Sequence, residues 1–547
     1  MNKIKKLLNG YYYLLLSLIS SIGMALLKFN GSELYSLYFL AFFFLLFLFF
    51  KKSDYFKHDL RTTRYSVIIS IILSLIMVIG QLTMVKEQSY DPSLVDIRIF
   101  HGISIVKLLI CLLGSFIFFY YLFIYIFANL YKLNIYENKN KKFKSWKVFV
   151  FCFLIIIICY IPYFLRCFPG IMSPDSFVQI KSVELGLLKN NHPFFQTWFF
   201  GGTYFLGKIL FGPGNMAIAF YISIQMIIIA SCYSLLITYL YNKNIKKSIL
   251  IAILIFFSLS PLHAFYSVTL WKDILFSVNF IFIIYSFKML DEYGMCKKSI
   301  LPLIVSLLIL LFFRNNGIYV LFIIIPFLII RFKDFRIYLS LILFSLVGFY
   351  YIVTGPVYNY IGVKQTTSVE AYSIPLQQIA RVIYLNDDIE DDLKKEINLF
   401  LDVDQVKENY INYISDNTKN LVNKKYFNNN KSDFYKLYLK LFLKYPVTYI
   451  EAYLAQTLGY WHPDTIYFAV GAVNSSSDKY NAWDYKIDNK PITNDYINSK
   501  IDSTLSKTIP FSILVWSTGL YCVMLFISIA ITLFNNNKKI YIYILHL

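Results

Sequence analysis

Charged residues are scarce in this chain. They make up 15% of the 547 residues, whereas hydrophobic residues make up 58%, and the mean hydropathy is +0.56. A soluble globular protein typically carries about 25% charged residues, so the composition excludes that class. Cysteine is also scarce: the seven cysteines show no metal-ligand spacing and no obvious pair, which argues against structural zinc and disulfides. No nucleotide-binding glycine-rich loop and no internal repeat is apparent.

What the chain has in abundance is apolar runs long enough to cross a bilayer. They predict an all-α polytopic membrane protein with about twelve transmembrane helices, interfacial helices and a small, mostly helical outer domain. The predicted spans lie near residues 10–28, 36–50, 66–85, 104–128, 148–165, 214–240, 248–262, 274–290, 299–313, 317–330, 337–354 and 511–534. The chain is thus expected to comprise N-terminal transmembrane helices (1–147), a transmembrane core (148–354), an extracytoplasmic helical domain (355–510), and a last helix with its tail (511–547).

The net charge of +20 belongs to the membrane part of the chain. Segment 355–510 holds 17 Lys and Arg residues against 19 Asp and Glu residues, so the basic excess lies elsewhere. It lies in short loops that the predicted spans place on one side, as the positive-inside rule requires for the cytoplasm: 3–6, 51–64, 139–147, 243–247 and 331–336. The pattern predicts a multi-pass cell-membrane protein with both termini cytoplasmic, and it argues against a nucleic-acid partner. We interpret the Lys-rich N-terminus as an uncleaved first helix rather than a signal peptide.

This topology leaves the polar stretches 166–213, 263–273, 314–316 and 355–510 outside. In the first of them, Ser173-Pro174-Asp175 is typical of a helix start. Asp175 either interacts only with the helix dipole or carries chemistry, and Gln179 falls on the same helical face.

His192 follows in a turn before Pro193. It is either a turn residue or a group that donates to a phosphate or holds a nucleophile's proton. The apolar segment 194–212 is predicted to be an interfacial or re-entrant helix, because a crossing there would move the basic loop 243–247 outside.

An external carboxylate, a His-Pro turn one short helix later, an interfacial helix, many spans and an outer domain together resemble the GT-C class of membrane glycosyltransferases. That class includes the protein mannosyltransferases, the aminoarabinose transferases of lipid A and the oligosaccharyltransferases. The chain resembles still more closely an uncharacterised bacterial family of multi-pass membrane proteins, from roughly residue 148 onward, through Pro-Gly-Ile-Met-Ser-Pro-Asp-Ser at 169–176, Leu-Trp-Lys-Asp at 270–273 and Ile-Pro-Leu-Gln-Gln-Ile-Ala-Arg at 374–381. In GT-C enzymes a loop carboxylate acts as base or metal ligand, and the resemblance carries that role to Asp175.

Two further outer positions combine with this carboxylate. Lys272 is a candidate for a lipid-linked phosphate and Asp273 for a second carboxylate, because adjacent opposite charges on a helix point different ways and do not readily satisfy each other; the alternative is an interfacial pair. Arg314 lies on the outer side against the positive-inside trend, which favours a phosphate contact over a helix end capped by Gly317.

In segment 355–510, Gln377 and Arg381 share one helical face and are candidates for phosphate or sugar contacts. Trp461 and His462 form an aromatic and polar turn of the kind that stacks on sugar rings, although an interfacial belt explains the tryptophan as well.

The expectation is therefore a glycosyltransferase that moves a sugar from a polyprenyl-phosphate-linked donor to a cell-envelope glycan, lipid or protein acceptor. Asp175, His192 and Asp273 are the expected catalytic residues. Gln179, Lys272, Arg314, Gln377, Arg381, Trp461 and His462 are the expected substrate-binding residues. The sequence does not identify a cofactor. A divalent metal ion shared by Asp175 and Asp273 is possible, but no further metal ligands are apparent beside them. The alternatives are a lipid or polysaccharide transporter or flippase, which would carry charges within its spans, and a non-enzymatic scaffold.

Overall fold

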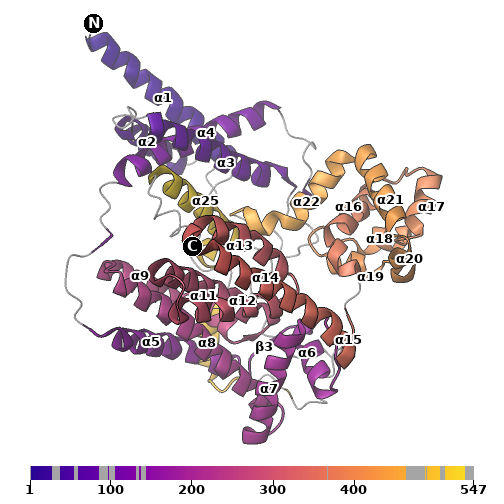
Figure 1. Ribbon diagram of the computed structural model, residues 1–547. Helices are drawn as coiled ribbons and strands as arrows, with labels where there is room; N and C mark the ends of the chain where they lie inside the picture. The colour runs from indigo at the N-terminus through magenta and orange to yellow at the C-terminus, as the bar shows by residue number, and fades with distance from the viewer. Residues whose placement is uncertain are drawn as a thin grey trace. The chain divides into compact units, whose positions relative to one another are not determined.

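The computed structural model describes residues 2–27, 37–53, 60–85, 96–97, 105–130, 135–136, 143–365, 368–463, 487, 490–505 and 512–535. Helices account for most of these residues (Figure 1). The strands within these ranges form two short pairs, β1 (Met84–Val85) with β2 (Asp96–Ile97) and β3 (Ile171–Met172) with β4 (Thr269–Leu270). The protein is therefore an all-α membrane protein, as the composition predicts. The basic residues predicted within 54–59 and 137–142, and the predicted tail from 536, lie outside the described residues.

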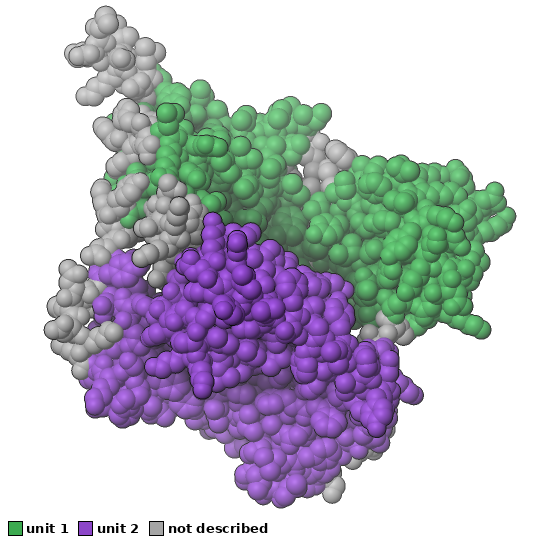
Figure 2. Space-filling model, viewed as in Figure 1, with its two compact units in different colours: residues 1–133, 367–467, 516–547 green, residues 134–366, 468–515 purple. Residues whose placement is uncertain are grey.

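The chain divides into two compact units, shown in green and purple in Figure 2. Unit 1 covers 1–133, 367–467 and 516–547, and unit 2 covers 134–366 and 468–515. Segment 355–510, predicted to be one outer domain, thus contributes to both units.

The elements of unit 1 are α1 (Asn2–Leu26), α2 (Leu37–Ser53), α3 (Leu60–Thr83), β1 (Met84–Val85), β2 (Asp96–Ile97), α4 (Ile105–Leu130), η6 (Ser368–Tyr372), α16 (Ser373–Leu385), α17 (Asp391–Asn398), α18 (Val403–Asn409), α19 (Ser415–Asn420), α20 (Lys424–Asn429), α21 (Lys431–Lys444), α22 (Pro446–Trp461) and α25 (Thr518–Asn535). Helices α16 to α22 enclose an apolar core of their own, which includes Leu376, Phe427 and Phe434. The predicted helix break at Tyr445-Pro446 is confirmed, because α21 ends before Tyr445 and Pro446 opens α22.

The elements of unit 2 are α5 (Ser145–Arg166), β3 (Ile171–Met172), α6 (Pro174–Glu184), α7 (Phe194–Phe211), α8 (Asn215–Asn242), α9 (Lys247–Leu259), α10 (Pro261–Ser267), β4 (Thr269–Leu270), α11 (Lys272–Tyr293), α12 (Lys297–Phe312), α13 (Gly317–Arg331), η4 (Lys333–Phe335), α14 (Arg336–Ile352), η5 (Val353–Val357), α15 (Tyr358–Ile361) and α23 (Asp495–Leu505). Helix α24 (Ser512–Trp516) spans the boundary between the units.

Six helical segments of the described chain are long and apolar enough to cross a membrane: Leu60–Gln81, Ile105–Leu130, Ser145–Arg166, Asn215–Asn242, Lys272–Tyr293 and Lys333–Ile361. A seventh arises if α9 and α10, which meet at a bend of 51°, form one broken span. The protein is therefore a multi-pass membrane protein. Ten of the twelve predicted spans each fall on one helix, whereas 248–262 covers α9 and the start of α10, and 511–534 covers α24 and α25. Several of these helices are shorter than a bilayer requires, so the number twelve stays a prediction.

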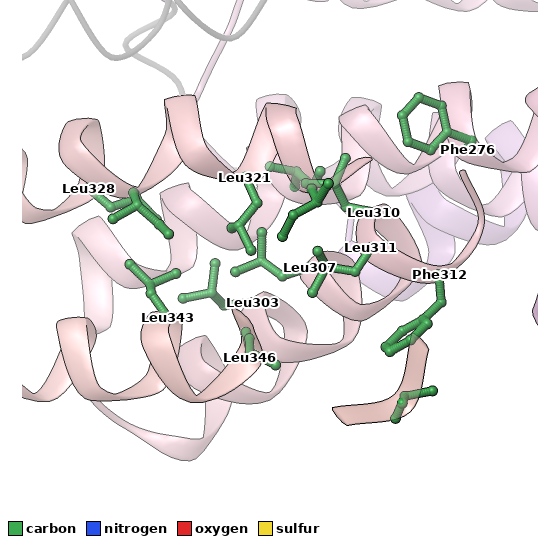
Figure 3. Packing of buried hydrophobic residues seen from close by; sticks show 14 of the residues in the cluster. Phe276, Leu303, Leu307, Leu310, Leu311, Phe312, Leu321, Leu328, Leu343 and Leu346 are labelled. Atoms are coloured by element: carbon green, nitrogen blue, oxygen red, sulfur yellow. The ribbon is translucent and has the colours of Figure 1, made fainter. Parts of the chain in front are cut away.

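Leucine and phenylalanine side chains hold α11 to α14 together (Figure 3). Leu303 and Leu307 from α12 lie between Leu321 of α13 and Leu343 of α14 (Figure 3). Phe276 extends this core to the first turns of α11. Because helices in a bilayer associate through close van der Waals packing, the cluster fixes the ends of these helices relative to one another. The start of α11 and the turn between α12 and α13 are the ends that carry the candidate site.

Candidate functional site

A two-residue parallel ladder joins the first two predicted outer loops. β3 pairs with β4 in a register that places Ile171 opposite Thr269. The residue after each strand is the N-cap of a helix: Ser173 precedes α6, and Trp271 precedes α11. Both helices carry an aspartate in the first turn, Asp175 in α6 and Asp273 in α11. The helix start predicted at Ser173-Pro174-Asp175 is confirmed. The ladder therefore brings two helix N-termini, each with a carboxylate, to neighbouring positions.

Buried polar side chains brace this ladder. Gln225 of α8 is fully buried, and its Nε2 donates to the carbonyls of Ser267 (2.9 Å) and Thr269 (2.8 Å) on either side of the turn into β4. The Ser176 hydroxyl accepts from the Ser173 amide (2.9 Å) and donates to the Leu270 carbonyl. Sequence reasoning missed both braces. A lone glutamine inside an otherwise apolar span is the signal that points to Gln225.

The Lys272 ammonium lies at the centre of the candidate site. Its Nζ donates to Oδ2 of Asp175 at 2.7 Å and lies 3.2 Å from Nδ1 of His192. Nearly half of the Asp175 side chain is exposed (47%), compared with 22% for Lys272. The carboxylate is therefore accessible to a substrate, while the ammonium is partly shielded between two partners.

His192 is a neutral imidazole at physiological pH. Burial, the main cause, and the nearby Lys272 charge lower its pKa from 6.5 to about 4, although Asp175 acts in the opposite direction. Because an ammonium only donates hydrogen bonds, Nδ1 accepts from Lys272 and the ring proton resides on Nε2. The side chain thus orients the ammonium without adding charge.

Asp273 points away from its neighbour Lys272 and pairs with Arg314, in the turn between α12 and α13. The guanidinium also lies over the Phe276 ring, 5.7 Å from its centroid. The side chains of Asp273 and Arg314 are 20% and 39% exposed. The expectation that Lys272 and Asp273 do not satisfy each other is confirmed, since each finds its partner on a different loop.

Backbone and amide contacts fasten the His192 loop to the other polar stretches. Asn315 Nδ2 donates to the Asn190 carbonyl at 3.1 Å, which ties this loop to the Arg314 turn. The backbone N–H of Asn190 donates to the Lys364 carbonyl at 2.9 Å. Four segments that are far apart in the sequence therefore meet within unit 2: those around Asp175, Lys272, Arg314 and Lys364.

Gln179 lies outside this accessible cluster. It is 1% exposed, and its Nε2 contacts Gln196 and lies 3.0 Å from the Thr197 hydroxyl, so it joins α6 to α7. Helix α7 itself begins at Phe194, where the interfacial helix is predicted, and exposes large apolar side chains such as Trp198 (62%) and Ile209 (81%). It is not among the helices that qualify as spans in the described chain.

The other four predicted substrate-binding residues belong to unit 1. Gln377 is buried, donates to the Ile411 carbonyl (2.8 Å) and accepts from Thr418 (2.7 Å). Arg381 is also buried and pairs with Glu451 at 3.3 Å.

Trp461 and His462 end α22. The Trp461 indole donates to Thr457 within the helix at 3.1 Å. His462 is fully buried, and this burial lowers its pKa to about 4. The structure thus assembles Asp175, His192, Lys272, Asp273 and Arg314 in one unit and leaves the unit 1 residues in a separate packed environment.

A metal ion finds little support in this arrangement. Among the described residues, no three His, Cys, Asp or Glu side chains are grouped so that they could hold one. The two site carboxylates each contact a cationic side chain instead. The described side chains of the site therefore do not form a metal-binding set.

No curated protein and no solved structure matches the chain. A family model does match: residues 182–547 correspond to a family of unknown function (DUF6020). The matched region begins just after Asp175 and includes His192, Lys272, Asp273 and Arg314. Because it covers about two thirds of the sequence, the chain belongs to this family of unknown function.

Proposed function

We propose that the protein is a GT-C-like membrane glycosyltransferase that moves a sugar from a polyprenyl-phosphate-linked donor to a cell-envelope acceptor. The observation that carries the proposal is the Lys272 ammonium held between Asp175 and His192, beside the Asp273–Arg314 pair. This arrangement supplies what the reaction requires, namely an accessible carboxylate and two cations supported by helix N-termini.

The cations are suited to a phosphate leaving group. Lys272 and Arg314 each contact a carboxylate in the absence of substrate, and a phosphate dianion or diester competes for the same donors. The first turns of α6 and α11 add amide dipoles of favourable sign. We expect Lys272 and Arg314 to stabilise the negative charge that develops on the phosphate oxygen as its bond to the sugar breaks.

Asp175 is the proposed general base. The acceptor hydroxyl oxygen attacks the anomeric carbon, the bond from that carbon to the phosphate oxygen breaks, and the polyprenyl phosphate leaves. The hydroxyl proton passes to the Asp175 carboxylate. Interaction of Lys272 with the departing phosphate frees the carboxylate from its pair as the proton arrives.

The positive-inside rule supports a site on the outer face, with twelve spans and both termini cytoplasmic. Leu185, just after α6, and Tyr293, at the far end of α11, are both well exposed (56% and 54%) and lie at the two predicted faces. In a variant without native cysteines, Leu185→Cys should react with an impermeant thiol reagent on intact cells, and Tyr293→Cys only after lysis. The reverse pattern would reject the outer-face site.

The distribution of charge along α11 favours a transferase over a transporter. Lys272 and Asp273 lie at its N-terminal end, whereas Lys288, Asp291 and Glu292 lie near its C-terminal end. A transporter that moves a charged lipid headgroup is expected to carry charged groups along the path between the faces. The intervening residues of α11 are uncharged.

The direct test is transfer from a panel of radiolabelled polyprenyl-phosphate sugars by the purified full chain in lipid nanodiscs. Label should move to a cell-envelope extract in a reaction that requires Asp175. Asp291→Asn is a matched control, since Asp291 also pairs with an arginine (Arg331, 2.6 Å) but lies about 28 Å along the same helix from Lys272. Transport of the labelled lipid across vesicles without transfer would instead establish the transporter.

A further inference from the structure

Next to the charged site, unit 2 contains a cavity of about 380 Å³. This volume lies within the range of small-molecule sites, about 300–1,000 Å³. Helices α8, α10 and α11 and the turn that precedes α11 line it. Asp273 belongs both to the cavity wall and to the pair with Arg314, so the cavity opens directly beside the proposed phosphate contacts.

One stripe of α11 shows that the cavity has a polar and an apolar end. Asp273, Ser277 and Ile281 follow one another at four-residue spacing, so they lie along one helical face and all line the cavity. The Ser277 hydroxyl donates to the Asp273 carbonyl at 2.8 Å, which leaves its lone pairs to accept from a ligand. A ligand in the cavity therefore meets oxygen groups first, at the N-terminal end of α11.

His263 supplies a buried polar group that sequence reasoning overlooked. Its Nδ1 lies 3.1 Å from the Tyr233 hydroxyl, and its ring packs edge-on against Phe256, with centroids 4.9 Å apart. Among the described residues, Nε2 of His263 has no hydrogen-bond partner although the atom is buried, and the residue lines the cavity. A buried polar atom without a partner is unfavourable, and a ligand hydroxyl that reaches Nε2 would relieve that cost.

Aromatic rings line the same space. Tyr266 and Trp271 both face the cavity, with ring planes inclined by only 26°. Flat aromatic faces pack against the apolar C–H faces of a ring, while the Trp indole provides a donor at its edge. The wall thus combines ring-stacking surfaces with hydrogen-bonding groups.

The charge balance of the wall restricts the ligand further. Asp273 is the acidic side chain of the lining, and it already pairs with Arg314. An anion would be repelled by the carboxylate, and a cation would compete with an existing guanidinium contact. The wall therefore favours a neutral ligand.

We infer that this cavity binds a neutral, hydroxylated ring, the sugar of the lipid-linked donor, with His263 and Ser277 as hydrogen-bonding groups and Trp271 as a stacking surface. The identification of this ring with the donor sugar rests on the proposed function, since the phosphate to which the sugar is attached would lie at Lys272 and Arg314. An apolar chain is the competing occupant. It would leave Nε2 of His263 without a partner.

Saturation-transfer NMR on the full chain in phospholipid nanodiscs tests the inference without any transfer reaction. The probes are the methyl glycosides of glucose, galactose, mannose and N-acetylglucosamine, and geraniol as an apolar chain with one hydroxyl. At least one glycoside should show saturation transfer. His263→Leu should weaken its binding about tenfold, the effect of one lost hydrogen bond, and His263→Gln should recover part of it.

Two serines provide a matched comparison. Ser277 and Ser223 each donate to the carbonyl four residues earlier at 2.8 Å, but only Ser277 lines the cavity. Ser277→Ala should weaken glycoside binding several-fold, and Ser223→Ala should not. No glycoside signal, a signal that all variants keep, or a signal from geraniol alone would overturn the inference.

The outcome separates this inference from the proposed function. Glycoside binding that depends on His263, with no transfer from any lipid-linked donor, would leave the cavity site standing and reject the transferase. Transfer that proceeds normally in a folded His263→Leu protein would leave the transferase standing and reject the sugar cavity.

Discussion

Two of the chain's arginine–carboxylate pairs lie in contrasting surroundings. In unit 1, Arg381 and Glu451 pair in a packed helical core where the arginine is completely buried. In unit 2, Arg314 and Asp273 pair at a helix start where the guanidinium is 39% exposed. A buried pair has no access to a ligand, so it serves the fold, whereas a partly exposed pair beside a cavity can exchange its partner for a substrate. The surroundings of a charge, not its presence in a polar motif, separate the two roles.

The same contrast holds for aspartates at helix starts. Asp402 caps α18 in unit 1, where its Oδ1 accepts from the amides of Asp404 and Gln405, both at 3.1 Å. Asp175 occupies the first turn of α6 in unit 2, but its carboxylate accepts from the ammonium of Lys272, a residue 97 positions away. One carboxylate serves its own helix, and the other joins two loops.

The largest effect is expected from Asp175→Asn. The substitution keeps size but removes basicity, and a positioned general base contributes about 10²–10⁴-fold to rate. Transfer measured with the labelled donor should fall by that factor while the thermal midpoint changes little. Asp291→Asn should keep its activity. Wild-type turnover in a folded Asp175→Asn protein would show that Asp175 belongs with Asp402 as a helix-start residue.

The opposite pattern is expected for Arg381→Met. Removing one partner of a buried pair leaves an uncompensated charge and costs about 3–5 kcal/mol of stability. The full chain should therefore unfold at a markedly lower temperature in a differential scanning measurement. Arg381→Met combined with Glu451→Leu should recover most of the loss, because no buried charge remains. If the single variant were stable and failed only in substrate binding, the comparison between the two units would be wrong.

A pH effect of up to about 3 kcal/mol is expected from His192. Its pKa is about 4 in the folded protein and 6.5 when unfolded, so between these values the unfolded chain binds the extra proton. Stability should therefore fall as the pH decreases from 6.5 to 4. His192→Gln, which keeps an acceptor for Lys272, should show a shallower loss over this window in thermal melts. Equal slopes for both proteins would contradict the neutral, buried imidazole.

Local sequence signals predicted the helices well. Apolar runs place most predicted spans each on one helix, Ser173-Pro174-Asp175 opens α6, and Pro446 opens α22. These features depend on neighbours within a few residues, so they can be predicted from the local sequence. Whether a short helix spans the membrane is harder to predict from the sequence. Helices α12 and α13 have only 16 and 15 residues, and whether they span depends on their tilt and packing.

The site was predicted only in part, for a related reason. Charge topology and helix-end positions singled out Asp175, Lys272 and Arg314, and the structure places all three in unit 2. The sequence around a single charged residue does not show whether its side chain is buried. Arg381 was therefore predicted to bind substrate, although the structure encloses it in a packed core. His263 was not predicted as a site residue, because its proposed role depends on a cavity that three helices form together.

The smallest effect sharpens the comparison between the two helix-start aspartates. Asp402→Ala removes two amide contacts at the start of α18, and loss of such a cap costs about 0.5–2 kcal/mol. A lower thermal midpoint is expected, together with unchanged transfer. Asp402→Asn keeps a side-chain oxygen and should recover most of the stability. Because Asp402→Asn and Asp175→Asn remove the same charge from the start of a helix, loss of transfer in only the second variant would assign the chemistry to the site and not to helix stability.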